Sequence, residues 1–388
     1  DLKDLNKLSF NFGCNMLFKD VIAQEELKKQ LIKTIKSNKV SHAQLFCGPE
    51  GCGHFAMAVA YAQLLLCHKR AEDSCGSCPS CIKIQQFAHP DVHFSFPIHL
   101  SKTNKVQQSD DVVKEFREMI SQSSYVGISH WNEFLGNQNK QGIIAVKESE
   151  SIIKKLSLKS FEGSYKILIM WLPELMNKEA ANKLLKLIEE PPKKTVFIFV
   201  ADSSDKIIDT ILSRMQKITF SSLSVEDVKM NLISQQNISK DQAENYARLS
   251  DGNFHKAQHL ISPNENDSLY LSAFISWMRL CYSRNISDTI DWVDEIANLG
   301  REQQKEFLLF TLEMFRQCII GHYSGETLTM LDVKQQQFLN KFSPFINHLN
   351  IVGLDDTINK AYYHLERNAN PKVLLLDVSL KFYSLLKK

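Results

Sequence analysis

Gly48-Pro-Glu-Gly-Cys-Gly-His-Phe55 keeps the glycine frame of a phosphate-binding loop but lacks the two residues on which such a loop depends. A working loop has the pattern G-x-x-x-x-G-K-[ST]: backbone N–H groups cradle phosphate, the Lys neutralises it and the hydroxyl ligates Mg²⁺. Gly48 and Gly53 hold the frame, while His54 replaces the Lys and Phe55 replaces the Ser or Thr. An imidazole with an ordinary pKa of ~6.5 is mostly uncharged at neutral pH, and a phenylalanine ring cannot ligate a metal. We expect a loop that keeps its shape but has lost the side chains that neutralise phosphate and ligate Mg²⁺.

The residues on both sides of the loop favour a nucleotide-binding core over an ordinary glycine-rich turn. Residues 42–47 (HAQLFC) are typical of a short buried strand, and residues 55–66 (FAMAVAYAQLLL) of a long apolar helix. Strand, glycine loop and helix follow one another in the order that places phosphate at a helix N-terminus.

Further strands and helices alternate along the chain. The patterns predict helices at 21–36, 146–158 and 178–190 and buried strands at 165–171 and 195–201. Pro191 and Pro192 end the last of these helices. Such alternation predicts an α/β fold with a parallel sheet and helices on both faces.

The rest of the chain divides into segments of different character. We expect residues 1–15 to be an extension with little fixed structure, and residues 93–142 to be an irregular, variable insertion with one helix at 111–122. After Phe220 the patterns are helical only, and the apolar stripe of Phe307, Leu308, Phe310, Leu312 and Phe315 is typical of a bundle core or a subunit interface. The predicted domains are 16–222, 223–265 and 266–388.

Composition limits the classes of function. The chain has 388 residues, 44% of them hydrophobic, and a formal net charge of +2, so bulk charge gives no case for nucleic-acid binding. We see no apolar run of the ~18 residues that a membrane span needs and no signal peptide. These features predict a cytoplasmic protein.

Four of the nine cysteines form the pattern C-x7-C-x2-C-x2-C at Cys67, Cys75, Cys78 and Cys81. Thiolates at this spacing can converge on one ion, and a closed shell of four sulfurs is typical of structural Zn²⁺. The alternative is unrelated free thiols. His68, His89 and His93 could each replace one ligand, or could be ordinary surface or turn histidines.

The order of these features resembles the clamp-loader branch of the AAA+ ATPases, and most closely its delta-prime family in bacterial DNA polymerase III. The resemblance runs from about Leu17 to Ala257. It rests on the glycine loop, on the cysteines and on these further segments: Phe18-Lys-Asp-Val-Ile-Ala-Gln24, Ser41-His-Ala43, His89-Pro-Asp91, Ala181-Asn-Lys-Leu-Leu-Lys-Leu-Ile-Glu-Glu-Pro-Pro192 and Thr210-Ile-Leu-Ser-Arg214. It implies an AAA+ RecA-like sheet domain with an inserted zinc module (67–81), a small helical lid domain and an all-α collar domain.

The resemblance also gives meaning to the departures. In active members paired acidic residues follow the strand that matches 167–170, whereas this chain has Trp171 and Leu172. The lid pattern G-x-x-R-x-A carries an arginine in active members, whereas Gly252-Asn-Phe-His-Lys-Ala257 has His255 there. We therefore expect no productive binding of ATP and Mg²⁺, and no ATPase activity of the isolated chain.

Arg214, in contrast, is a motif residue that this chain retains. The resemblance implies that it is an arginine finger facing the nucleotide of a neighbouring subunit. The family motif is Ser-Arg-Cys, and here it is Ser213-Arg214-Met215. The alternative is an arginine that closes a helix C-terminus through the helix dipole.

The resemblance thus implies a non-catalytic subunit that assembles with the motor (gamma/tau) and delta subunits of a clamp loader. That complex loads the sliding clamp on primer–template DNA. One alternative is an ATP-hydrolysing gamma/tau-type subunit. Another is a zinc-ribbon DNA-binding protein, which would need a basic, aromatic surface beside the cysteines; only His68, Lys69, Arg70 and Lys83 are close in sequence.

Overall fold

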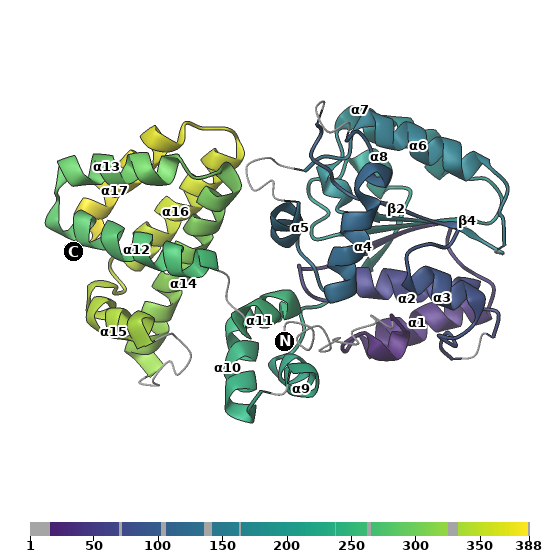
Figure 1. Cartoon of the computed structure of the whole chain (residues 1–388), viewed down its shortest axis with the longest axis horizontal. Coiled ribbons are helices and arrows are strands. Elements are labelled where there is room, and N and C mark those ends of the chain that lie inside the picture. The colour runs from purple at the N-terminus through teal and green to yellow at the C-terminus, as the bar shows by residue number, and fades with distance from the viewer. Residues whose placement is uncertain are drawn as a thin grey trace, which may run out of the picture. The chain divides into compact units, whose positions relative to one another are not determined.

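The computed structural model describes residues 16–69, 72–101, 106–135, 142–162, 164–236, 238–261, 265–324 and 333–386. The extension predicted at residues 1–15 lies outside these ranges. The chain forms two compact units, one with the described residues up to Gln258 and the other with those from His259 (Figure 1).

The first unit is built on a five-stranded parallel sheet in the order β2-β3-β4-β1-β5. The strands are β1 (Ala43–Cys47), β2 (Val92–Ser95), β3 (Lys166–Trp171), β4 (Thr195–Ala201) and β5 (Gln216–Thr219). The three central strands are buried along their whole length, as a parallel sheet covered on both faces requires. The predicted α/β class and the strands β1, β3 and β4 are confirmed.

Helices cover both faces of this sheet (Figure 1). α1 (Glu25–Lys36) and α2 (His54–Leu66) lie on one side, and α6 (Val146–Ser157) and α7 (Lys178–Glu189) on the other. Every residue of α2 is buried, which explains its uniformly apolar sequence. Asn177 caps α7 by accepting a hydrogen bond from the backbone N–H of Ala180.

The segment 93–142 differs from the irregular insertion that we expected. Its described residues supply most of β2, a 3-10 turn (Ser109–Val112), α4 (Val113–Gln122) and α5 (Ile128–Phe134). Phe116 of α4 and Trp131 of α5 are fully buried against the sheet domain. The polar stretch 121–124 lies between these two residues in the sequence, so no periodic pattern indicated that they share a core.

Short helices complete the first unit. α3 (Pro79–Gln85) follows the cysteine loop, and α8 (Asp209–Leu212) precedes β5. α9 (Val225–Gln236) and α10 (Lys240–Ser250) pack against each other, and α11 (Phe254–Ile261) begins beside the glycine loop. Beyond β5 the described residues are helical, as predicted.

The second unit is a helical bundle of α12 (Glu265–Ser283), α13 (Ile286–Ala297), α14 (Arg301–Ser324), α15 (Val333–Phe342), α16 (Ile351–Glu366) and α17 (Pro371–Leu385). Phe307, Leu308 and Phe315 lie in its core, while Phe310 and Leu312 pack at the edge. Of the two alternatives that we predicted for this stripe, bundle core or subunit interface, these positions agree with bundle core. None of the helices described here is long and apolar enough to cross a membrane.

Candidate functional site

The glycine loop joins β1 to α2 as the sequence predicts. Gly51 and Gly53 have φ angles of 75° and 91°, in the left-handed region that glycine adopts without strain. The backbone frame of a phosphate-binding loop is therefore present.

His54, at the position of the missing Lys, is buried and faces Asp202. Its Nε2 atom lies 3.0 Å from Oδ1 of Asp202, which directly follows β4. Burial is the largest single influence and disfavours the charged imidazole, but interactions with Asp202 and Cys52 together outweigh it and raise the pKa of His54 to about 10. Our expectation of a mostly uncharged imidazole is wrong, because it ignored these partners. The charge is matched by a carboxylate within the chain and is not directed at a ligand.

Phe55 and Trp171 replace the hydroxyl and a carboxylate that would ligate Mg²⁺, and the two rings contact each other. Their centroids are 6.1 Å apart, and Phe116 of α4 lies 6.0 Å from Phe55 and 5.9 Å from Trp171. All three side chains are at most 2% exposed, and so is Leu172. The two positions that would ligate Mg²⁺ in a working site are therefore part of an aromatic core, which offers no ligand to a hydrated cation.

Carboxylates also gather around the loop. Burial, together with the charge of Asp202, raises the pKa of Glu50 to about 7 and that of Glu174 to about 7. Glu174 Oε1 accepts a hydrogen bond of 2.8 Å from the backbone N–H of Asp202. Sequence reasoning missed these three residues, although Asp202 stands at the carboxyl end of a predicted strand, where ligand sites of parallel sheets form. Glu50 and Glu174 are therefore only partly charged at neutral pH.

The α4–α5 connection covers the loop. A Cβ atom added to Gly53 would lie only 3.0 Å from the ring of Tyr125, and one added to Gly127 would lie 2.3 Å from Oε1 of Glu50. Tyr125 is 6% exposed, and its hydroxyl oxygen accepts a hydrogen bond of 2.8 Å from the backbone N–H of Ile22. The side of the loop on which Tyr125 lies is therefore closed by protein.

The same connection reaches the residues after α10. The ring of Phe254 packs 5.0 Å from that of Tyr125, and its backbone N–H donates to the carbonyl of Gly51 at 3.2 Å. His255, at the position of the missing lid arginine, stacks on His130 of α5 with 5.1 Å between ring centroids. Residues 113–134 thus touch Phe55, Trp171 and His255, which depart from the motifs, and also the retained Gly53.

Arg214 stands apart from this cluster, between α8 and β5, and about a third of its side chain is exposed. Its guanidinium donates hydrogen bonds to Glu189, Thr210 and Ser213. Arg214 therefore lies partly exposed at the surface, with its guanidinium paired inside the chain.

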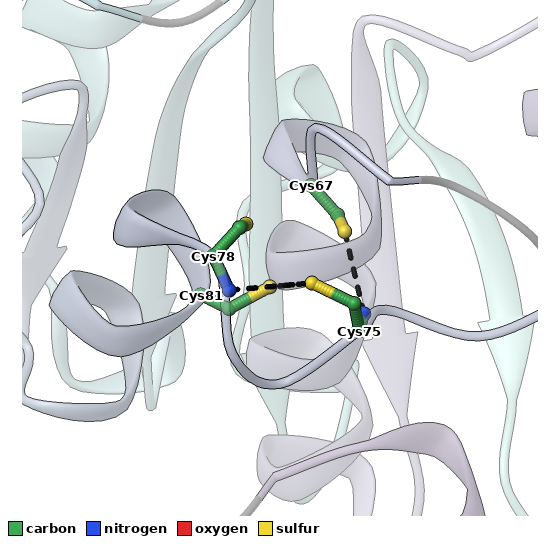
Figure 2. A group of neighbouring side chains, drawn as sticks. All are labelled: Cys67, Cys75, Cys78 and Cys81. Carbon is green, nitrogen blue, oxygen red and sulfur yellow. Dashed lines mark hydrogen bonds between the residues drawn. The ribbon is translucent and has the colours of Figure 1, made fainter.

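The four predicted cysteines converge on one point (Figure 2). Their sulfur atoms all lie within 4.8 Å of one another, and the Sγ atoms of Cys75 and Cys81 are 3.9 Å apart. A tetrahedral shell with Zn–S bonds of about 2.3 Å has sulfur atoms about 3.8 Å apart. The backbone N–H groups of Cys75 and Cys78 donate to the Sγ atoms of Cys67 and Cys75, each at 3.3 Å. The four cysteines could hold a metal ion.

Histidine is not part of this group in the described chain. His68 instead lies 3.2 Å from the hydroxyl of Ser80, and burial lowers the pKa of His93 to about 4. The cysteine loop is attached to the start of the domain, because the Asp73 carboxylate accepts hydrogen bonds from the backbone N–H groups of Phe18 and Lys19. This attachment is typical of a structural element.

Comparison with known proteins gives one matching family, described as DNA polymerase III, delta subunit, over residues 23–224, which is more than half of the chain. Among curated relatives, the chain is 23% identical to DNA polymerase III subunit tau of Bacillus subtilis, over 92% of this chain and 59% of the relative. It is 26% identical to DNA polymerase III subunit delta' of Bacillus subtilis (55% and 52% covered) and 28% identical to that of Haemophilus influenzae (48% and 45%). The chain thus spans about half the length of these relatives.

Comparison with solved structures gives a Bacillus subtilis DNA clamp loader delta protein, at 12% identity and a TM-score of 0.32 over 93% of this chain and all of that one. It also gives the RuvB Holliday junction branch migration motor of Thermotoga maritima, at 14% identity and a TM-score of 0.39, with 81% and 82% covered.

Proposed function

We propose, since this chain belongs to the DNA polymerase III delta subunit family, that it is a non-hydrolysing, delta-prime-type subunit of a clamp loader. In this role it assembles with motor (gamma/tau) and delta subunits in the cytoplasm. Together they load the sliding clamp on primer–template DNA during replication. The AAA+ sheet domain is residues 16–222, the lid 223–265 and the collar 266–388.

The observation that carries this proposal is the filling of the nucleotide pocket by the chain itself. Phe116 packs on Phe55 and Trp171, and Tyr125 packs on Gly53. Loss of a single motif residue would weaken ATP binding, and buried aromatic rings at the positions of the Mg²⁺ ligands would weaken it further, because they offer the metal no oxygen. The chain then contributes shape and surface to the complex, and its partners supply hydrolysis.

A gamma/tau-type motor is the second candidate, favoured by the match to subunit tau over 92% of this chain. The two candidates differ in one measurement. Turnover of MgATP by the isolated chain would establish the motor and reject the non-hydrolysing subunit.

We further propose that Cys67, Cys75, Cys78 and Cys81 hold one structural Zn²⁺. The S–S distances and the closed set of thiol ligands support zinc, which prefers such a shell. The hydrogen bonds that Asp73 accepts from the backbone N–H groups of Phe18 and Lys19 support a structural role for the cysteine loop over that of a separate DNA-binding ribbon.

Arg214 is proposed to act in trans on the ATP of a neighbouring motor subunit. A guanidinium can stabilise charge on a phosphoryl group in transfer, and fingers of this kind contribute ~10³–10⁵ in rate where measured. Surface exposure of the side chain supports this role over a purely structural one.

The test is ATP turnover of the complex reconstituted with wild-type chain, with Arg214→Ala and without the chain. Arg214→Ala should fold and assemble normally while the neighbour's site slows, so that turnover of the whole complex falls. Arg248→Ala is the matched control, since Arg248 is another exposed arginine paired with a glutamate, Glu244. Equal turnover with Arg214→Ala and wild type would remove the finger role.

A further inference from the structure

The guanidinium of Arg214 is held within its own chain. Nε donates to Oε1 of Glu189 at 2.6 Å, and Nη2 pairs with the same oxygen. Nη1 donates to the carbonyl of Thr210 at 2.6 Å and to the hydroxyl of Ser213 at 3.1 Å. Glu189 comes from the end of α7, whereas Thr210 and Ser213 belong to the α8 region that carries Arg214 itself.

This arrangement leaves little of the guanidinium for a ligand. A guanidinium has five N–H donors in a fixed planar fork, and phosphate is recognised best by two parallel N–H groups of that fork. The four contacts above engage most of these donors. An arginine in this position cannot present a free fork to a phosphate until one of its partners is released.

We propose that Glu189 retains Arg214 in a withdrawn position, and that reaching a neighbour's nucleotide requires exchange of this carboxylate for phosphate. The proposal rests on the proposed role of Arg214 as a finger acting in trans. Glu189 is then a positioning residue whose effect is restraint.

Three features suit Glu189 to a reversible restraint. It lies in the last turn of α7, where the helix dipole disfavours a carboxylate, so the pair with Arg214 compensates an otherwise unfavourable charge. Pro191 and Pro192 follow one residue later, after Glu190, and end the helix, which fixes the place of Glu189. Both side chains are partly exposed, at 35% and 43%, and ion pairs of this kind have little net strength, so a multiply charged phosphate can displace the carboxylate.

The experiment is a double-mutant cycle in the reconstituted complex, with ATP as substrate. Glu189→Gln keeps the shape but removes the charge, and should raise kcat by up to about five-fold, the factor equivalent to an exposed ion pair. KM for ATP should not change, because the finger acts on the phosphoryl step. In the Arg214→Ala background Glu189→Gln should have no effect. Glu190→Gln is the control, since it removes the same charge from the adjacent exposed residue.

The dependence of turnover on ionic strength provides a second readout, which would not change if Glu189 had only a structural role. Added salt screens the ion pair in the wild type, so the ratio of Glu189→Gln to wild-type turnover should fall towards one as ionic strength rises. A lower or unchanged kcat in Glu189→Gln overturns the restraint, and so does a rise that persists without Arg214. If Arg214→Ala alone leaves turnover unchanged, the finger itself fails; if it lowers turnover while Glu189→Gln does nothing, only the restraint fails.

Discussion

Phe55→Thr restores the hydroxyl that a magnesium-binding loop needs, and we expect it to destabilise the sheet unit without creating an ATP site. Phe55 is 2% exposed and packs against Phe116 and Trp171. Loss of a fully buried phenylalanine costs ~3–5 kcal/mol, and each aromatic pair contributes ~0.5–1.5 kcal/mol beyond its burial. Thr retains part of the side chain but buries a hydroxyl without an assigned partner. The free energy of unfolding should therefore fall by about 4 kcal/mol.

Urea denaturation, followed by tryptophan fluorescence, measures this loss. Phe161→Thr is the matched control, because the same change at a side chain that is 79% exposed should cost less than about 0.5 kcal/mol. The double variant His54→Lys and Phe55→Thr restores both motif residues and should still fail to retain a fluorescent ATP analogue with Mg²⁺. A loss of stability below about 1 kcal/mol together with nucleotide binding would refute our account of the filled pocket.

Two further predictions concern the metal and pH. Cys78→Ser should remove about one Zn²⁺ per chain and lower the melting temperature of the sheet unit, and elemental analysis that finds no metal in the native protein would end the zinc proposal. Glu50 and Glu174, with pKa values of about 7 instead of 4.5, bind protons more tightly when folded, so their contribution to stability is present below pH 4.5 and is lost as pH rises through 7. The loss of stability is at most ~3 kcal/mol for each group. Glu174→Gln should make the melting temperature depend less on pH between pH 5 and 7.5. A pH dependence parallel to that of the wild type would contradict the raised pKa of Glu174.

The elements that could be predicted from the sequence have local signals. β1, the glycine loop and α2 are contiguous, and the four cysteines of the metal group lie within 15 residues of one another. The missed strands, β2 and β5, have four residues each and lie at the two edges of the sheet. β5 is largely exposed, so it has no continuous apolar run to reveal it.

The filling of the site could not be predicted, because its contacts join distant residues. His54 meets Asp202 across 148 positions, and this partner helps to raise a pKa that the sequence alone suggested to be ordinary. Tyr125 and His130 belong to a segment without clear periodicity, and only the fold brings them to Gly53 and His255. Sequence reasoning recognised which functional groups were lost, but not what replaced them.

The contacts of Tyr125 with Phe254 and of His130 with His255 have a consequence for how this chain responds to nucleotide. A bound nucleotide bridges two parts of a protein only to the extent that its concentration exceeds its dissociation constant. His130 and Tyr125 are tethered to the same chain as His255 and Phe254, so their effective concentration is set by the fold and cannot be diluted or outcompeted. The bridge between the sheet and the residues after α10 should therefore be insensitive to the ratio of ATP to ADP, and in the proposed complex it should persist through every cycle of hydrolysis by a neighbouring subunit.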